Sequence, residues 1–240
     1  MEDIQSYWDK EREVYAKISD QGMASYIREL PGMDQAFAIK DRSIRCMDEG
    51  TPGGLHIAGS GILMSEEELR SYIEKAKPDG AYSHGSCGAC GIYAKQAHTH
   101  EDCPDDCGPE WCKRMEEMTG IRYLGHIAKE EMNRPADAHI ARCAYYDGRG
   151  DFDYSLVNGL PAGFIISRAF MTADYALKEA EIACQIAMGG HGYGSLISAD
   201  EPFYLFVIAK DGEGLAGLKT ELHSIVDRFE GRVIVDGFIA

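Results

Sequence analysis

The sequence lacks any long apolar run. No stretch of its 240 residues approaches the roughly 20 consecutive apolar residues of a transmembrane helix, so we expect no membrane span. Residues 1–6 have neither a basic start nor an apolar run, so the sequence contains no recognisable signal peptide. We therefore expect a cytoplasmic protein, in which the eight cysteines are thiols or metal ligands rather than disulfides.

Basic residues are also scarce. The 24 Lys and Arg residues are outnumbered by 40 Asp and Glu residues, which gives a net charge of −16. A negative field of this size repels phosphate backbones and anionic lipids, so we expect neither nucleic acid nor a membrane surface as a partner. The sequence shows no internal repeat and no low-complexity tract, which excludes solenoid and linker-like organisation.

Apolar runs of strand length alternate with amphipathic helical patterns. The predicted strands are 36–39, 43–47, 80–83, 121–128, 138–146, 163–167, 203–209 and 232–235. The predicted helices are 4–18, 23–30, 65–77, 88–97, 172–188 and 214–229. This alternation predicts an α/β fold with a central, mostly parallel sheet flanked by helices. The simplest organisation is one domain, and two compact domains are also compatible with the length.

A glycine-rich stretch at residues 82–91 carries the clearest chemical signal. It places His84 and Cys87 three residues apart in a turn that follows a predicted strand. Cys46 ends an earlier predicted strand, and the carboxyl ends of parallel strands meet at one edge of a sheet. Two thiolates and one imidazole are a zinc ligand set that leaves a fourth tetrahedral position free. The sequence therefore predicts one zinc ion on Cys46, His84 and Cys87.

The fourth position decides what such a site can do. Water there makes a catalytic site, whereas a protein side chain makes a closed one. Asp48 follows Cys46 by two residues and is the candidate to lie in or beside this position. Asp48 is thus both a candidate catalytic residue and a candidate fourth zinc ligand.

These motifs resemble the β-class carbonic anhydrases. The resemblance is carried by Cys46-x-Asp48 and the later His84-x-x-Cys87-Gly, by Leu-His-Ile-Ala-Gly at 55–59 and by Tyr-Tyr-Asp-Gly-Arg-Gly at 145–150. It covers residues 35–154 and lapses after about residue 159. We accordingly expect an N-terminal helical arm at 1–34, a zinc-binding α/β core at 35–158 and a C-terminal α/β extension of the same domain at 159–240.

The resemblance implies a lyase that hydrates carbon dioxide reversibly to bicarbonate by zinc-bound hydroxide, with Asp48 accepting a hydrogen bond from that hydroxide. Helices at the N-terminus embrace a partner subunit in this family, so the resemblance also implies a homodimer or a larger homo-oligomer. Packing of the same helix on its own chain is an equal alternative.

The family arginine that holds the aspartate off the metal is missing, because Gly50 stands at its place. Either another cation holds Asp48, with Arg42, Arg45 and Arg142 as candidates, or Asp48 ligates zinc. We expect Asp48 to close the site in at least part of the population. A closed, catalytically weak or silent zinc protein is therefore one alternative function, and a hydrolase of carbonyl sulfide or carbon disulfide is another.

Two further cysteine patterns remain open. Cys87 and Cys90 form a Cys-x-x-Cys pair at a helix start, which is also the setting of a dithiol redox enzyme. Cys103, Cys107 and Cys112 lie in a segment that also contains two histidines, and they are candidates for a second, structural zinc. A reduced, solvated loop or a single disulfide is the alternative for this segment. Four other residues are interpreted as structural. We expect His126 and His139 at the edge of the core or on the surface, and Cys143 and Cys184 as buried small residues.

Overall fold

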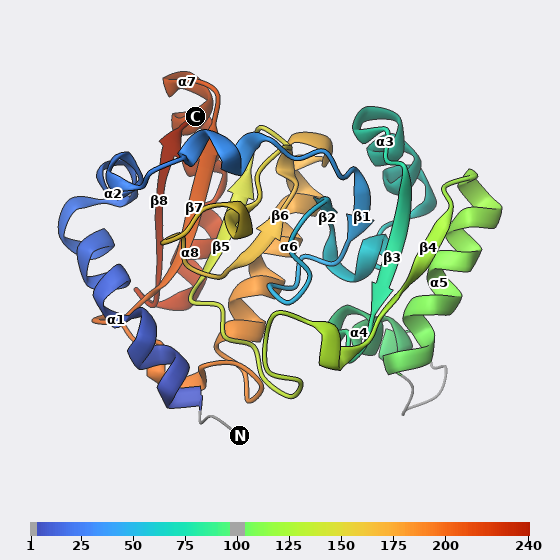
Figure 1. The fold of residues 1–240 in the computed structure, drawn as a ribbon, viewed down its shortest axis with the longest axis horizontal. Coiled ribbons are helices and arrows are strands. Elements are labelled where there is room, and N and C mark those ends of the chain that lie inside the picture. The colour runs from blue at the N-terminus through green and yellow to red at the C-terminus, as the bar shows by residue number, and fades with distance from the viewer. Residues whose placement is uncertain (1–3, 97–103) are drawn as a thin grey trace.

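The computed structural model describes residues 4–96 and 104–240 (Figure 1). In this part of the chain, parallel strands form two four-stranded sheets flanked by helices, which confirms the predicted α/β class. The first sheet contains β1 (Ser43–Arg45), β2 (Leu55–His56), β3 (Gly80–His84) and β4 (Tyr123–Ile127). The second contains β5 (Cys143–Asp147), β6 (Phe164–Ile166), β7 (Phe203–Ala209) and β8 (Val233–Ile239).

The two sheets share one topology. Their strand orders are β2-β1-β3-β4 and β6-β5-β7-β8. The first half of the chain, up to β4, and the second half, from β5 onwards, therefore each place their first strand between their second and third. They adjoin through β6, because the Ile165 N–H donates to the Met47 carbonyl at 3.0 Å and the Ser167 N–H donates to the His56 carbonyl at 3.1 Å (Figure 1). The order of the strands is therefore repeated in the two sheets, although the sequence shows no internal repeat.

The second sheet begins earlier than the sequence indicated. β5 lies inside the expected core at 35–158, but it pairs with β6 and β7. All residues of β5 and β7 are buried, as expected for parallel strands that are covered on both faces.

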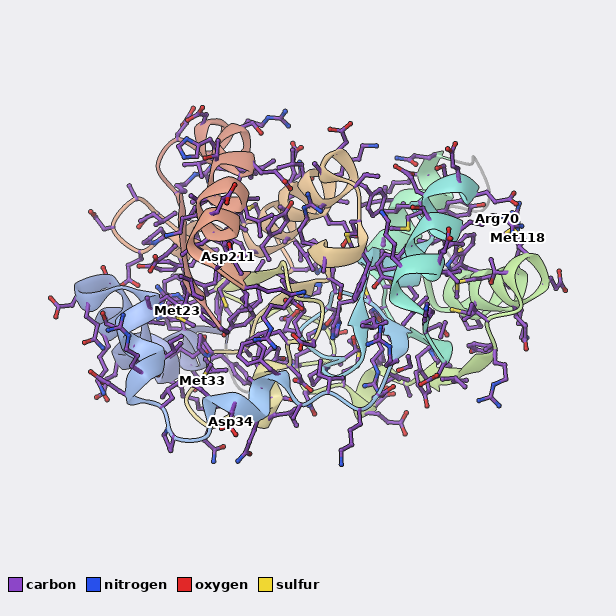
Figure 2. The ribbon with its side chains drawn as sticks, turned by 90° about the horizontal axis from the view of Figure 1, so that it is seen from above. Met23, Met33, Asp34, Arg70, Met118 and Asp211 are labelled. Atoms are coloured by element: carbon purple, nitrogen blue, oxygen red, sulfur yellow. The ribbon has the colours of Figure 1, made fainter. Side chains whose placement is uncertain are left out.

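Helices cover both sheets. They are α1 (Ile4–Gln21), α2 (Met23–Tyr26), α3 (Glu66–Ala76), α4 (Gly88–Gln96), α5 (Pro104–Thr119), α6 (Ala173–Ala187), α7 (Gly212–Glu221) and α8 (His223–Val226). The predicted capping box opens α3: Ser65 Oγ accepts from the Glu68 N–H at 3.2 Å, and a Glu68 carboxylate oxygen accepts from the Ser65 N–H at 2.9 Å. Arg70 on α3 donates to the Met118 carbonyl on α5 at 2.8 Å, which joins these helices at one end of the molecule (Figure 2). Within residues 4–96 and 104–240, no helix combines the length and apolar character needed to cross a membrane.

Two predicted elements differ in the structure. Residues 36–39 were expected to be extended, but Met33–Phe37 is a 3-10 helix that follows the left-handed Gly32 and buries Ala36. The single helix predicted at 214–229 is divided among α7, α8 and a 3-10 turn at Asp227–Phe229. None of the residues of α7 is buried, whereas Leu222 and Ile225, which follow it, are buried in the core. The division between α7 and α8 lies at this change in burial.

The apolar face of α1 packs on its own chain. Trp8, Tyr15 and Ile18 are buried, and the guanidinium of Arg142 lies 3.5 Å from the Trp8 ring centroid and 4.2 Å from that of Tyr15. Tyr15 also stacks on Tyr204 of β7 at 5.6 Å between centroids. This packing accounts for the amphipathic pattern of the N-terminal helix without a partner subunit.

Deleting residues 1–21 is therefore expected to lower stability while leaving the first sheet able to bind metal. Each large apolar side chain that α1 buries contributes about 1.5–3 kcal/mol, so the loss amounts to several kcal/mol. Denaturant unfolding and zinc content of the truncated protein measure the two effects. Loss of subunit assembly with unchanged monomer stability would contradict this assignment.

Candidate metal centre

Cys46, His84 and Cys87 come together as the sequence predicted. Their ligand atoms all lie within 4.8 Å of one another, and each side chain is buried. Cys46 follows β1, His84 ends β3, and β1 and β3 are parallel neighbours, so their carboxyl ends meet. Cys87 directly precedes α4. Its hydrogen bond with Cys46 lowers the pKa of its thiol, but the hydrogen bond with Cys90 and burial raise that pKa above its usual value.

The donor set fits a zinc ion. The Nδ1 atom of His84 lies 2.8 Å from the Gly85 carbonyl, which fixes the ring, while its buried Nε2 has no hydrogen-bond partner among the described residues. The hydrogen bond with Cys87, and then burial, raise the pKa of the Cys46 thiol well above its usual value. Both sulfurs therefore need a bound cation to be held as thiolates, and two sulfurs with one imidazole nitrogen match the preferences of zinc. The residues present therefore fit the metal.

Asp48 is held by an arginine that sequence reasoning did not identify. Arg134 Nε donates to Asp48 Oδ1 at 2.7 Å, and Arg134 Nη2 donates to Oδ2 at 2.8 Å. The Gly50 N–H donates to the same Oδ1 at 2.8 Å. Asp48 is not a member of the Cys46, His84 and Cys87 group. Its carboxylate is bound by a guanidinium, whereas the sequence made it a candidate fourth zinc ligand.

The three arginines proposed from the sequence have other partners. Arg42 donates to the Ala76 carbonyl, Arg45 pairs with Asp41 at 2.7 Å, and Arg142 pairs with Glu201 at 2.9 Å. Asp48 is not among these partners. Of the two alternatives left open by the sequence, the structure shows the one in which another cation holds Asp48, but that cation is none of the three candidates, and the expected closed site with Asp48 on zinc is not what the structure shows.

Gly50 makes room for Arg134. A Cβ at position 50 would lie 2.9 Å from Arg134 Cγ, 2.7 Å from Met132 Cε and 3.0 Å from Asp48 Oδ1. These distances are shorter than side-chain carbons normally approach. The glycine in the motif and the distant arginine are therefore two parts of one arrangement.

The pKa of Asp48 reflects this pairing. Burial alone would raise it, but the hydrogen bonds from Arg134, with the positive charges of His84, His139 and Arg134, hold it well below the usual range. Asp48 is 4 % exposed, so water screens the pair little. Asp48 is thus a fixed carboxylate at neutral pH.

His139 and Glu49 form a second layer around Asp48. Nδ1 of His139 lies 3.0 Å from Glu49 Oε2 and 3.9 Å from Asp48 Oδ2, and Glu49 Oε1 accepts from the Ile140 N–H at 2.7 Å. Burial opposes the charged imidazole, but the neighbouring carboxylates, Glu49 first, raise the pKa of His139 above its usual value. The sequence placed His139 at the core edge or surface, and no local spacing links it to Asp48.

The centre faces a small apolar space and a wider cavity. The small space, about 10 Å³, lies beside Cys46 and Asp48, with Phe164, Ile182 and Ile186 among its walls. The wider cavity of about 580 Å³ is lined by Cys87, Arg134 and His139, and again by Ile182 and Ile186. Ile182 and Ile186 belong to α6, so the second half of the chain walls the centre of the first.

The other cysteines form no comparable cluster in the part of the chain that the structure describes. Cys103 of the predicted second zinc site lies outside the described residues, while Cys107 and Cys112 both lie on α5. Among the residues searched, no metal-ligand group includes Cys107 or Cys112. Cys143 and Cys184 are buried, as the sequence indicated.

Comparisons with family models, with curated proteins and with solved structures find no match for this chain. The likeness to the β-class carbonic anhydrases thus stays a resemblance in the motifs. The chemistry of the centre rests on Cys46, His84 and Cys87 and on the adjoining pair of Asp48 and Arg134.

Proposed function

We propose that this protein is a zinc-dependent enzyme that hydrates carbon dioxide reversibly, like a β-class carbonic anhydrase. One observation carries the proposal: Arg134 binds both carboxylate oxygens of Asp48 beside a ligand set of two thiolates and one imidazole. Because Asp48 is held laterally, the fourth metal position stays available to solvent. Zinc, when bound there, supplies an activated water as the nucleophile.

The residues around the metal then have distinct roles. Asp48, held by Arg134, is the hydrogen-bond acceptor that orients the nucleophile, and its remaining lone pairs are free for this. Met47, Phe164 and Ile182 line the small apolar space beside it, which at about 10 Å³ has room for about one water molecule. His139 and Glu49 fix the surroundings of Asp48 from the side of the wider cavity.

Stopped-flow measurement of carbon dioxide hydration on zinc-replete protein tests the proposal. We expect hydration well above the buffer rate, lost on removal of zinc by a chelator and greatly reduced in Asp48→Asn. Full zinc occupancy without hydration would indicate a silent zinc protein, and turnover of carbonyl sulfide or carbon disulfide alone would indicate the related hydrolase.

We further propose that the protein is cytoplasmic and, on the resemblance, that it forms a homodimer or a larger homo-oligomer. Light scattering at micromolar concentration tests the assembly. A monomer there would remove it from the proposal without affecting the metal centre.

A further inference from the structure

A buried carboxyl group of the second half reaches the first. Glu179 lies on α6 and is 0 % exposed, and its Oε1 accepts a hydrogen bond from the Ala58 N–H at 2.8 Å. Ala58 begins the 3-10 turn Ala58–Gly61, which belongs to the first half. Buried acids are rare in protein cores and require a specific partner, so this contact calls for an explanation beyond packing.

The turn that Glu179 holds is in contact with the metal centre. The Gly59 N–H, next along the chain from Ala58, donates to Cys46 Sγ at 3.2 Å. A Cβ at Gly59 would lie 2.8 Å from Ala89 Cβ and 3.6 Å from Cys87 Sγ, so the turn passes close to both sulfurs. Any movement of this turn therefore changes the hydrogen bonding of a metal ligand.

The turn is in a conformation that needs outside support. Gly59 and Ser60 are both left-handed, with φ of 55° and 54°, and for the non-glycine Ser60 this conformation is unfavourable by itself. Three contacts hold the turn: Glu179 at Ala58, the Ser60 hydroxyl donating to the Tyr82 carbonyl at 2.6 Å, and Trp111 Nε1 donating to the Ser60 carbonyl at 3.1 Å.

Glu179 acts here as a neutral acceptor. Burial, which outweighs the lowering effect of the hydrogen bond from the Ala58 N–H, raises the pKa of Glu179 to about 8. The group therefore keeps its proton near neutral pH, and a glutamine amide of the same shape offers the same carbonyl acceptor. This equivalence supplies a conservative control.

We propose that Glu179 is a positioning residue for the metal centre: it fixes the Ala58 N–H so that the neighbouring Gly59 N–H points at Cys46 Sγ. The proposal rests on the metal centre of the proposed function, although not on its catalysis. An N–H donor stabilises a thiolate and helps the metal to compete with a proton for the sulfur. The second half of the chain thus tunes the site of the first.

The test uses the full chain with Glu179→Leu, which removes the acceptor, and Glu179→Gln, which keeps it. Cobalt(II) serves as the spectroscopic probe, and competition with a chelator gives the zinc affinity. For Glu179→Leu we expect the sulfur-to-cobalt charge-transfer band to move to lower energy and zinc affinity to fall about 10-fold, the low end for partners of metal ligands. Glu179→Gln should match the wild type in both measurements.

An unchanged cobalt band and an unchanged zinc affinity in folded Glu179→Leu would overturn the proposal. If that variant does not fold, Glu179→Asp, which keeps the acid but is one methylene shorter, is compared with Glu179→Gln in its place. Failure of both Leu and Asp variants to fold would assign Glu179 a structural role only and overturn the proposal too. Wild-type protein that binds no cobalt overturns the metal centre and this proposal together, whereas bound cobalt without carbon dioxide hydration counts against the proposed catalysis alone.

Discussion

Replacing Cys87 by serine is expected to weaken zinc binding by at least about 100-fold. Mutation of a residue that only hydrogen-bonds to a metal ligand lowers metal affinity by up to about 100-fold, and loss of a ligand itself should lower it at least as much. Cys87 supplies one of the three donor atoms of the Cys46, His84 and Cys87 group, which all lie within 4.8 Å of one another. A serine hydroxyl keeps its proton at neutral pH and binds zinc poorly, so the variant leaves one thiolate and one imidazole. Competition with a chelator of known affinity measures the change.

Cys90→Ser is the matched control. Cys90 is also buried, lies one helical turn along α4 and belongs to the same Cys-x-x-Cys pattern, but it is outside the metal-ligand group. Its replacement should leave zinc affinity within a few-fold of the wild type. Equal loss of zinc in both variants, or full retention in Cys87→Ser, would count against the assigned ligands; a redox dithiol site would make both cysteines essential to activity.

The three metal ligands could be found from the sequence because their arrangement is nearly local. His84 and Cys87 share one turn, and Cys46 ends a strand whose parallel neighbour delivers His84. The rule that parallel strands present their carboxyl ends at one edge then brings the three residues together. The same local reasoning located α3, whose capping box is encoded by Ser65 and Glu68.

The partner of Asp48 could not be found in this way. Arg134 is 86 residues away in sequence, in a segment without regular structure, and no periodicity or spacing marks it. The sequence shows that a glycine stands at position 50 in place of the family arginine. Which residue supplies the positive charge instead depends on the packing of Met132 and Arg134 against Gly50. His139 and Glu49 were missed for the same reason.

The repeated strand order was also invisible in the sequence. Asp147 ends β5 as Asp48 follows β1, and both carboxylates accept backbone N–H groups just downstream, from Arg149 and Phe152 in one case and from Gly50 in the other. Yet in the described second half no group of metal ligands accompanies Asp147. Backbone topology tolerates far more sequence change than a set of metal ligands does, so the second half can have the same strand order without the ligands. Its helix α6 instead lines the cavity beside the metal centre of the first half.

Arg134→Ala is expected to destabilise the protein by about 3–5 kcal/mol near neutral pH, because it leaves the carboxylate of Asp48 buried without its partner. In the wild type the pKa of Asp48 is lowered, so its pairing stabilises the fold above the unfolded-state pKa of about 4 and is lost only in stronger acid. In the variant, burial instead raises this pKa. The stability difference between the two proteins should therefore shrink as the pH falls towards 4, which denaturant unfolding across this range measures.

The same variant should also lose turnover. Asp48 without its guanidinium is free to approach zinc and close the fourth position, so carbon dioxide hydration should fall by about 100-fold or more while zinc stays bound. Arg168→Ala is the matched control, because Arg168 also holds a carboxylate by two hydrogen bonds, to Glu221 at 2.7 and 2.9 Å, away from the metal. It should lower stability and leave turnover per folded protein unchanged.

A double variant separates the guanidinium from its position. Gly50→Arg alone should destabilise the protein, because its Cβ would lie 2.7 Å from Met132 Cε and 2.9 Å from Arg134 Cγ. Combined with Arg134→Ala, the new arginine starts beside Asp48 and enters the space that Arg134 vacates, so it should restore part of the stability and turnover lost in Arg134→Ala. If the double variant is instead worse by the sum of the two single effects, Arg134 holds Asp48 for structural reasons alone, and the open-site interpretation loses its main support.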